Sequence, residues 1–183
     1  MRVDSRDYDE ATLLAARDEK DKVFRTSSES PIPADKRESF PGLRFYDPSA
    51  DYFVHADVIW YNPADTIIIG ATAGGDERRA IRAATLSFTL NGQPSRLSGF
   101  RLITSTTPYD GMLFVPFRDA TNGFATYEAG RYMDVPVEQG DDSVSIDFNT
   151  AYHPLCLFNN AYSCPLPPPE NTLRYKVEAG EKK

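Results

Sequence analysis

Side chains that could bind a small molecule are concentrated between Phe114 and Asn171. Arg118, Asp119 and Thr121 follow an apolar run at the start of this stretch, and Arg131 lies further along it. Because the planar guanidinium group binds carboxylates and phosphates through two hydrogen bonds, these residues predict a pocket for a small anionic or polar molecule. The alternative is an arginine–aspartate pair that only joins two loops.

The predicted ligand-binding site gathers the charged, hydroxyl and amide side chains of this stretch: Arg118, Asp119, Thr121, Tyr127, Arg131, Asn149 and Tyr152. In this hypothesis the arginines bind the anionic part of the ligand, Asp119 orients one of them, and the tyrosines stack against the ligand. A small-molecule-binding protein is the first expectation. An enzyme that uses the same pocket, either a hydrolase or a flavin- or cofactor-dependent redox enzyme, is the second, and a structural or protein-interaction module is the third. No particular cofactor is assigned.

Three residues in this stretch have the side-chain types of a catalytic thiol and its partners. Asp147, His153 and Cys156 could act as orienting carboxylate, base and nucleophile. Pro154 lies between the histidine and the cysteine, and a spacing of three residues does not by itself direct the ring at the sulfur. A structural histidine and a packed thiol are therefore favoured over catalysis.

The two cysteines, Cys156 and Cys164, allow three interpretations. Two thiols in a reducing compartment are favoured, because disulfides are rare in the cytosol. A disulfide that closes the short loop between them is the second alternative. A metal site that adds His153 ranks last, because zinc usually takes four ligands in closely spaced pairs, and the sequence predicts no metal.

The overall charge excludes several partners. The formal charge of −7 and the pI near 4.9 repel phosphate backbones, and the basic residues are scattered, so we expect no nucleic acid partner. No apolar run approaches the roughly 18 residues of a membrane-spanning helix, so we expect no membrane segment. The charged start of the chain lacks the apolar middle of a signal peptide, and the cytoplasm is the expected location. The oligomeric state is not predicted.

Apolar periodicity and turn residues predict one helix and a series of strands. Residues 7–25 repeat apolar positions at helical spacing, with Asp7 or Asp9 as N-cap. Asn91-Gly92 between two alternating runs predicts a hairpin that pairs residues 80–90 with 94–104. The full set of expected strands is 43–47, 52–61, 66–72, 80–90, 94–104, 112–117, 125–134, 144–148 and 172–177.

These elements predict one mainly β domain over residues 1–183. Strands that follow one another without alternating helices favour an antiparallel barrel or sandwich over a parallel sheet. The expected organisation is a helix over 7–25 packed against a β domain over 43–177, followed by a charged tail over 178–183. A barrel of this size can hold one small ligand at its mouth.

Short segments spread over the chain carry a resemblance to a known family: S-P-I at 30–32, F-P-G-L at 40–43, F-V-P-F-R-D-A-T-N-G at 114–123, T-Y-E-A-G-R-Y at 126–132, D-F-N-T-A-Y at 147–152, C-P-L-P-P-P-E-N at 164–171 and A-G-E at 179–181. The sequence resembles the DUF1684 family, bacterial and archaeal proteins of unknown function, over nearly its whole length. The resemblance implies no activity, cofactor or partner. The family more often has Asn-Pro before the first cysteine, where this sequence has His153-Pro154, which weakens a mechanism that rests on His153.

Overall fold

One long helix precedes the sheet. The computed structural model describes residues 8–103 and 111–183, and in it α1 spans Glu10–Thr26. Asp9 is the N-cap, since its carboxylate accepts hydrogen bonds from the Thr12 amide and hydroxyl at 3.1 and 2.6 Å. The predicted helix and the Asp9 cap are confirmed, whereas residue 7 and its predicted cap lie outside the described residues.

α1 contacts the rest of the molecule through a few buried side chains, one of which is charged. Its buried residues are only Leu13, Arg17 and Phe24. Arg17 donates hydrogen bonds to the backbone carbonyls of Tyr46 and Asn149 at 2.9 and 3.0 Å. The thin apolar stripe is therefore supplemented by hydrogen bonds from a buried guanidinium group to the backbone.

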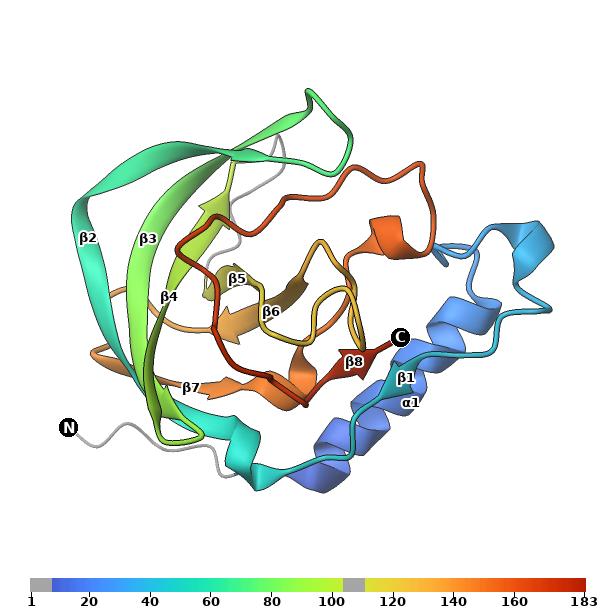
Figure 1. Cartoon of the computed structure of the whole chain (residues 1–183), viewed down its shortest axis with the longest axis horizontal. Coiled ribbons are helices and arrows are strands. Elements are labelled where there is room, and N and C mark those ends of the chain that lie inside the picture. The colour runs from blue at the N-terminus through green and yellow to red at the C-terminus, as the bar shows by residue number, and fades with distance from the viewer. Residues whose placement is uncertain (1–7, 104–110) are drawn as a thin grey trace.

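Six strands form one antiparallel sheet in the order β6-β5-β4-β3-β2-β7. Their bounds are β2 Phe53–Gly70, β3 Glu77–Leu90, β4 Gln93–Leu102, β5 Met112–Phe117, β6 Arg131–Pro136 and β7 Ser143–Asp147. Figure 1 shows the sheet curving round until β7 comes back near β6, so that it nearly closes into a barrel. The predicted mainly β fold with an N-terminal helix is confirmed.

The hairpin between β3 and β4 forms where the sequence predicts it. Leu90 pairs with Gln93, and the two residues between them, Asn91 and Gly92, both have positive φ, at 53° and 72°. This conformation matches the right-handed twist of the strands and favours asparagine followed by glycine. The last residue of the predicted second strand, 104, lies outside the described residues.

A second, two-stranded sheet holds the C-terminus against the segment that follows α1. β1 (Arg44–Phe45) pairs with β8 (Glu181–Lys182), and Figure 1 shows this pair between the barrel and α1. Glu181 is buried, so the end of the chain is part of the packed structure. The remaining short elements are single 3₁₀ turns: η1 Ala34–Lys36, η2 Ala50–Tyr52, η3 Phe148–Thr150 and η4 Leu155–Leu157.

Four expected strands need correction. The strand expected over 172–177 is wrong: this segment is irregular apart from one bridge between Thr172 and Arg118, and the Val177 carbonyl binds a side chain instead of a neighbouring strand. The strand expected over 125–134 begins only at Arg131, because the residues before it form turns. The runs expected over 52–61 and 66–72 are one strand, β2, with a shift of register between Trp60 and Asp65.

Strand alternation separates an inner and an outer apolar surface. Leu113, Val115 and Phe117 of β5 point into the barrel, where they join the main core, while Phe114 lies on the other face. On the outer face, Phe114 packs with a small cluster that includes Tyr132 and the two cysteines. Large side chains pack together in the barrel interior.

Among the described residues, no helix combines the length and the apolar character that a membrane crossing needs.

Candidate functional site

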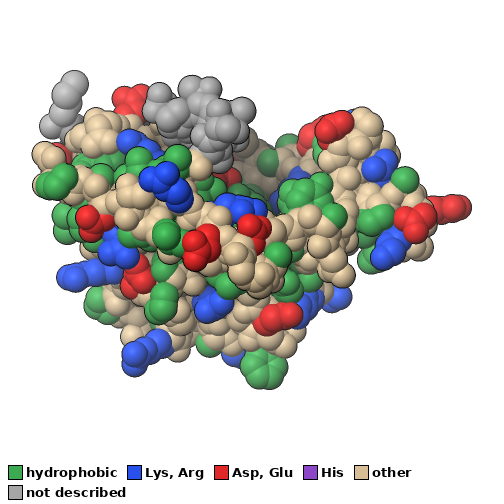
Figure 2. Space-filling model, turned by 90° about the horizontal axis from the view of Figure 1, so that it is seen from above, with side chains coloured by type: hydrophobic (Ala, Val, Ile, Leu, Met, Phe, Trp, Pro, Cys, Tyr) green, Lys and Arg blue, Asp and Glu red, His purple; other side chains and the backbone are tan. Residues whose placement is uncertain are grey.

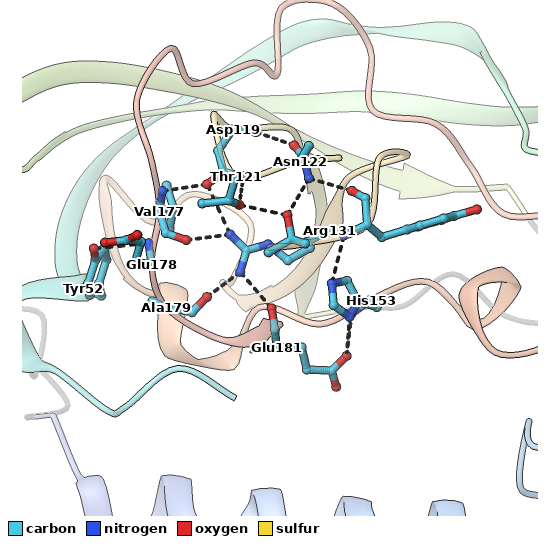
Figure 3. Close-up of polar contacts among 12 residues, drawn as sticks. Tyr52, Asp119, Thr121, Asn122, Arg131, His153, Val177, Glu178, Ala179 and Glu181 are labelled. Carbon is cyan, nitrogen blue, oxygen red and sulfur yellow. Dashed lines mark hydrogen bonds and ion pairs between the residues drawn. The ribbon is translucent and has the colours of Figure 1, made fainter. Parts of the chain in front are cut away.

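Arg131 lies at the start of β6 and is wholly buried. Its Nη2 lies 3.4 Å from the Asp119 carboxylate and donates to the Val177 carbonyl at 2.8 Å. Its Nη1 donates to the carbonyls of Ala179 and of Glu181, the latter at 3.2 Å (Figure 3). Burial lowers the pKa of Arg131, and the Asp119 carboxylate opposes this effect. The guanidinium group therefore binds the C-terminal segment of the same chain.

Asp119 and Thr121 complete the same buried network. Asp119 accepts hydrogen bonds from the Val177 amide at 2.6 Å and from the Thr121 hydroxyl at 2.7 Å. The Asn122 side-chain oxygen in turn accepts from the Asp119 amide at 2.6 Å. The structure thus brings together Asp119, Thr121 and Arg131, as the sequence suggests, in an arrangement that joins the turn after β5 to the C-terminal segment (Figure 3).

The turn before β6 can approach β5 closely because residue 130 is glycine, and this approach brings Arg131 next to β5. Gly130 has a φ of +102°, and a Cβ there would lie 2.7 Å from the Phe117 carbonyl oxygen. Both the backbone conformation and the close approach therefore require glycine.

Of the other predicted site residues, Tyr127 meets this network through its backbone carbonyl, which accepts from the Asn122 side chain at 2.7 Å. Asn149 is buried, and its amide bridges to the backbone of Ser49, donating at 2.8 Å and accepting at 3.1 Å. Arg118 is half-buried, and its backbone pairs with Asn171 and Leu173. Tyr127 and Tyr152 are on the outer side of the sheet, in the cluster around the cysteines.

His153 is held inside the protein by both ring nitrogens. Nε2 accepts a hydrogen bond from the Tyr127 amide at 3.3 Å, and Nδ1 lies 3.5 Å from the Glu181 carboxylate. Burial, together with the positive charges of Arg131 and Lys20, lowers the pKa of His153 to about 3. The nearby carboxylate favours the imidazolium form but does not outweigh burial, so the ring is neutral at physiological pH.

The structure does not assemble the trio of Asp147, His153 and Cys156. Asp147 accepts from the Asn149 amide at 2.9 Å as the cap of η3, and the ring of His153 faces Tyr127 and Glu181. The arrangement matches the favoured interpretation of a structural histidine.

Both cysteines are free thiols. The Cys156 amide donates to the Cys164 sulfur at 3.4 Å, and the Cys156 thiol lies 3.9 Å from the Tyr127 hydroxyl. Burial raises the pKa of Cys164 to about 11. Within 8–103 and 111–183, no three His, Cys, Asp or Glu side chains lie close enough together to hold a metal ion.

A cavity of about 630 Å³ lies between α1 and the outer face of β4, β5 and β6. Its walls come from four separate parts of the chain: Lys20 and Phe24 of α1; Phe100, Arg101 and Leu102 of β4; Met112, Phe114, Tyr132 and Asp134 of β5 and β6; and Tyr152, Pro154, Leu155, Tyr162, Ser163, Cys164 and Pro165. Figure 2 shows a hollow in the surface between the barrel and the segment that follows α1 in the chain.

Aromatic rings form much of the cavity wall. Phe114 and Tyr132 pack edge to face with centroids 4.7 Å apart, and Tyr132 packs against Tyr152 at 5.7 Å. The Tyr132 hydroxyl donates to the Pro165 carbonyl, which fixes the loop after Cys164 to the sheet. Burial raises the pKa of Tyr132, so its hydroxyl stays a donor.

Polar groups gather where α1 meets this wall. The Lys20 ammonium lies 2.7 Å from the buried Glu181 carboxylate and 4.7 Å from the centroid of the Tyr152 ring. The Tyr152 hydroxyl donates to Asp134 at 2.8 Å.

Of the predicted site residues, Tyr152 lines this cavity. The sequence did not predict that α1 and β4 form part of this cavity wall. A helical or alternating pattern shows which face of an element is apolar, but it does not show which elements lie together around a cavity. One signal was available: Phe114 and Tyr132 are aromatic at outward-facing strand positions, where an exposed sheet face normally carries polar residues.

These features define a class: a mostly β protein whose six-stranded sheet nearly closes into a barrel, with an N-terminal helix across it and an aromatic cavity between the two. The chain belongs to the DUF1684 family of proteins of unknown function, whose model matches residues 38–182. It is also similar to an uncharacterised protein of Haloarcula marismortui solved by solution NMR, at 40% identity and a TM-score of 0.73 over 95% of this chain and 94% of that chain. A comparison with curated proteins finds no match.

Proposed function

We propose that this protein binds a small molecule in the cavity between α1 and strands β4, β5 and β6. The observation that carries the proposal is the cavity itself, with a volume of about 630 Å³ and walls of packed aromatic and aliphatic side chains. Ligand sites in proteins commonly have volumes of about 300–1,000 Å³ and mostly apolar walls with a few polar groups.

Burial of apolar surface supports the same conclusion. An apolar molecule that covers the apolar side chains of the wall removes their surface from water, which is favourable. Phe100 and Phe24 are both buried and both line the cavity, so this space is continuous with the packed interior. The stretch 114–171, which the sequence singles out for binding, supplies much of the wall. The binding groups differ from those expected, because Arg131 binds backbone carbonyls instead.

Two tyrosines with equal exposure provide a matched test. Tyr162 lines the cavity and Tyr61 of β2 does not, and each is 38% exposed. The uncharged dye N-phenyl-1-naphthylamine should fluoresce on binding to the wild type. Tyr162→Ala should weaken its affinity by about tenfold, because loss of a stacked ring removes about 0.5–1.5 kcal/mol beyond the area it buries.

Tyr61→Ala should leave the affinity unchanged. Amide shifts in a dye titration followed by NMR should concentrate on the residues that line the cavity. Equal affinity in both variants, no binding to the wild type, or shifts confined to another face would refute the proposal.

A further inference from the structure

The positive charge nearest the aromatic wall already has a partner. Lys20 lies 2.7 Å from the carboxylate of Glu181, and that carboxylate is only 1% exposed. The other oxygen of Glu181 accepts from the His153 amide at 2.7 Å. A ligand carboxylate that took over Lys20 would leave a buried carboxylate without its counter-ion, which is strongly unfavourable.

Arg101 is the second cationic residue at the cavity, and its guanidinium group contacts residues outside the cavity wall. The Arg101 Nη2 donates to the Gln139 side-chain oxygen at 3.1 Å, and its guanidinium carbon lies 5.6 Å from the centre of the Trp60 ring. Neither Gln139 nor Trp60 lines the cavity. Arg101 therefore directs its head group away from the cavity.

Asp134 is the carboxylate in the cavity wall, and its negative charge would repel an anionic ligand. Asp134 is bound by the Tyr152 hydroxyl at 2.8 Å, on the same wall that Lys20 covers. Because the Arg101 head group points away, Lys20 is the cation that faces the described part of the wall, and it is already paired with Glu181. Among the described lining residues, no unpaired positive charge is therefore available to an anionic ligand, and the Asp134 carboxylate already accepts from Tyr152.

We infer that the cavity takes an uncharged, mainly apolar molecule with a ring or alkyl body, an inference that rests on the proposed function. The aromatic wall binds that body by stacking and burial. A hydroxyl or carbonyl group on the ligand would lie toward Lys20 and Tyr152, where the polar groups of the wall are gathered.

Two dyes that share one skeleton test this inference. N-phenyl-1-naphthylamine is uncharged, and 1-anilinonaphthalene-8-sulfonate is the same molecule with an added sulfonate. Fluorescence titration of the native protein should give at least about tenfold tighter binding of the uncharged dye. Equal or tighter binding of the sulfonate would overturn the inference and leave the proposed function standing. If neither dye binds, the proposed function fails as well.

Asp134→Asn separates charge from shape as the cause of the preference. The asparagine oxygen still accepts the Tyr152 hydroxyl, but the negative charge is removed. The ratio of the two dye affinities should fall in this variant, because the sulfonate no longer meets a carboxylate. A ratio that stays the same would show that the size of the sulfonate group, and not its charge, sets the preference, and the inference would be overturned.

Discussion

The Nη2 atom of Arg131 lies 3.4 Å from Oδ2 of Asp119, and both side chains are wholly shielded from solvent. Around this pair, the Thr121 hydroxyl and the carbonyl and amide groups of the segment from Val177 to Glu181 provide further hydrogen bonds, while Nε of Arg131 has no partner among the described residues. Because hydrogen bonds must offset much of the cost of burying an ion pair, the pair and the C-terminal segment depend on each other. The end of the chain is irregular in backbone conformation but is held by specific contacts.

Replacing Arg131 should therefore cost stability. Arg131→Lys keeps the charge but cannot present donors to three separate carbonyls and a carboxylate, as the planar guanidinium group does. We expect the free energy of unfolding to fall by about 1–3 kcal/mol, because at least one buried acceptor is left without its donor. Urea denaturation followed by circular dichroism measures this change.

The exposed Arg96 of β4 provides the control, since Arg96→Lys should change the unfolding free energy by less than about 0.5 kcal/mol. If Arg131→Lys were as stable as the wild type but bound the dye more weakly, Arg131 would belong to a ligand site.

His153 should make stability depend on pH. Its pKa in the folded protein is about 3, against an ordinary value of 6.5. Between these values the unfolded chain binds a proton that the folded chain does not, so stability rises with pH across this window and is lost as the pH falls. From pH 6.5 to pH 5 the loss from this residue should approach about 2 kcal/mol.

His153→Asn should remove that part of the slope, because asparagine does not titrate. Urea denaturation at pH 5, 6 and 7 compares the variant with the wild type. His55 is exposed, so His55→Asn is the matched control and should keep the wild-type slope. Identical slopes for the wild type and His153→Asn would contradict the assignment of a buried, neutral ring.

The Cys164 thiol should react slowly while the protein is folded. A pKa raised to about 11 leaves little thiolate at neutral pH, and only the thiolate is alkylated. We expect iodoacetamide to modify Cys164 about 100-fold more slowly at pH 7 in the folded protein than in urea, and the folded rate to rise with pH up to about pH 11. Peptide mass spectrometry after timed quenching gives the rate at this cysteine separately. Rapid alkylation of the folded protein at pH 7 would mean a reactive, activated thiol and would favour the enzymatic alternative.

Local sequence was sufficient for elements whose determinants are close together in the chain. Asp9 caps α1, Asn91-Gly92 closes the β3–β4 hairpin, and residues 112–117 form β5, because each depends on a side chain, a turn or an alternation within a few residues. Local sequence failed for residues 172–177, where apolar residues predicted a strand. There the amide and carbonyl of Val177 bind the side chains of Asp119 and Arg131. No pattern within the segment predicts such partners.

The amino-acid sequence by itself determined that this is a mainly β chain with one helix, and it marked residues 114–171 as unusually rich in polar and aromatic groups. Only the tertiary structure decided that Arg131 points inward to backbone carbonyls and that Lys20 is paired with Glu181. It also decided that α1 closes a cavity against the outer face of the sheet. The physical reason is that periodicity fixes which face of a strand or helix is apolar. The partner that covers this face is selected by the global packing of segments far apart in the chain.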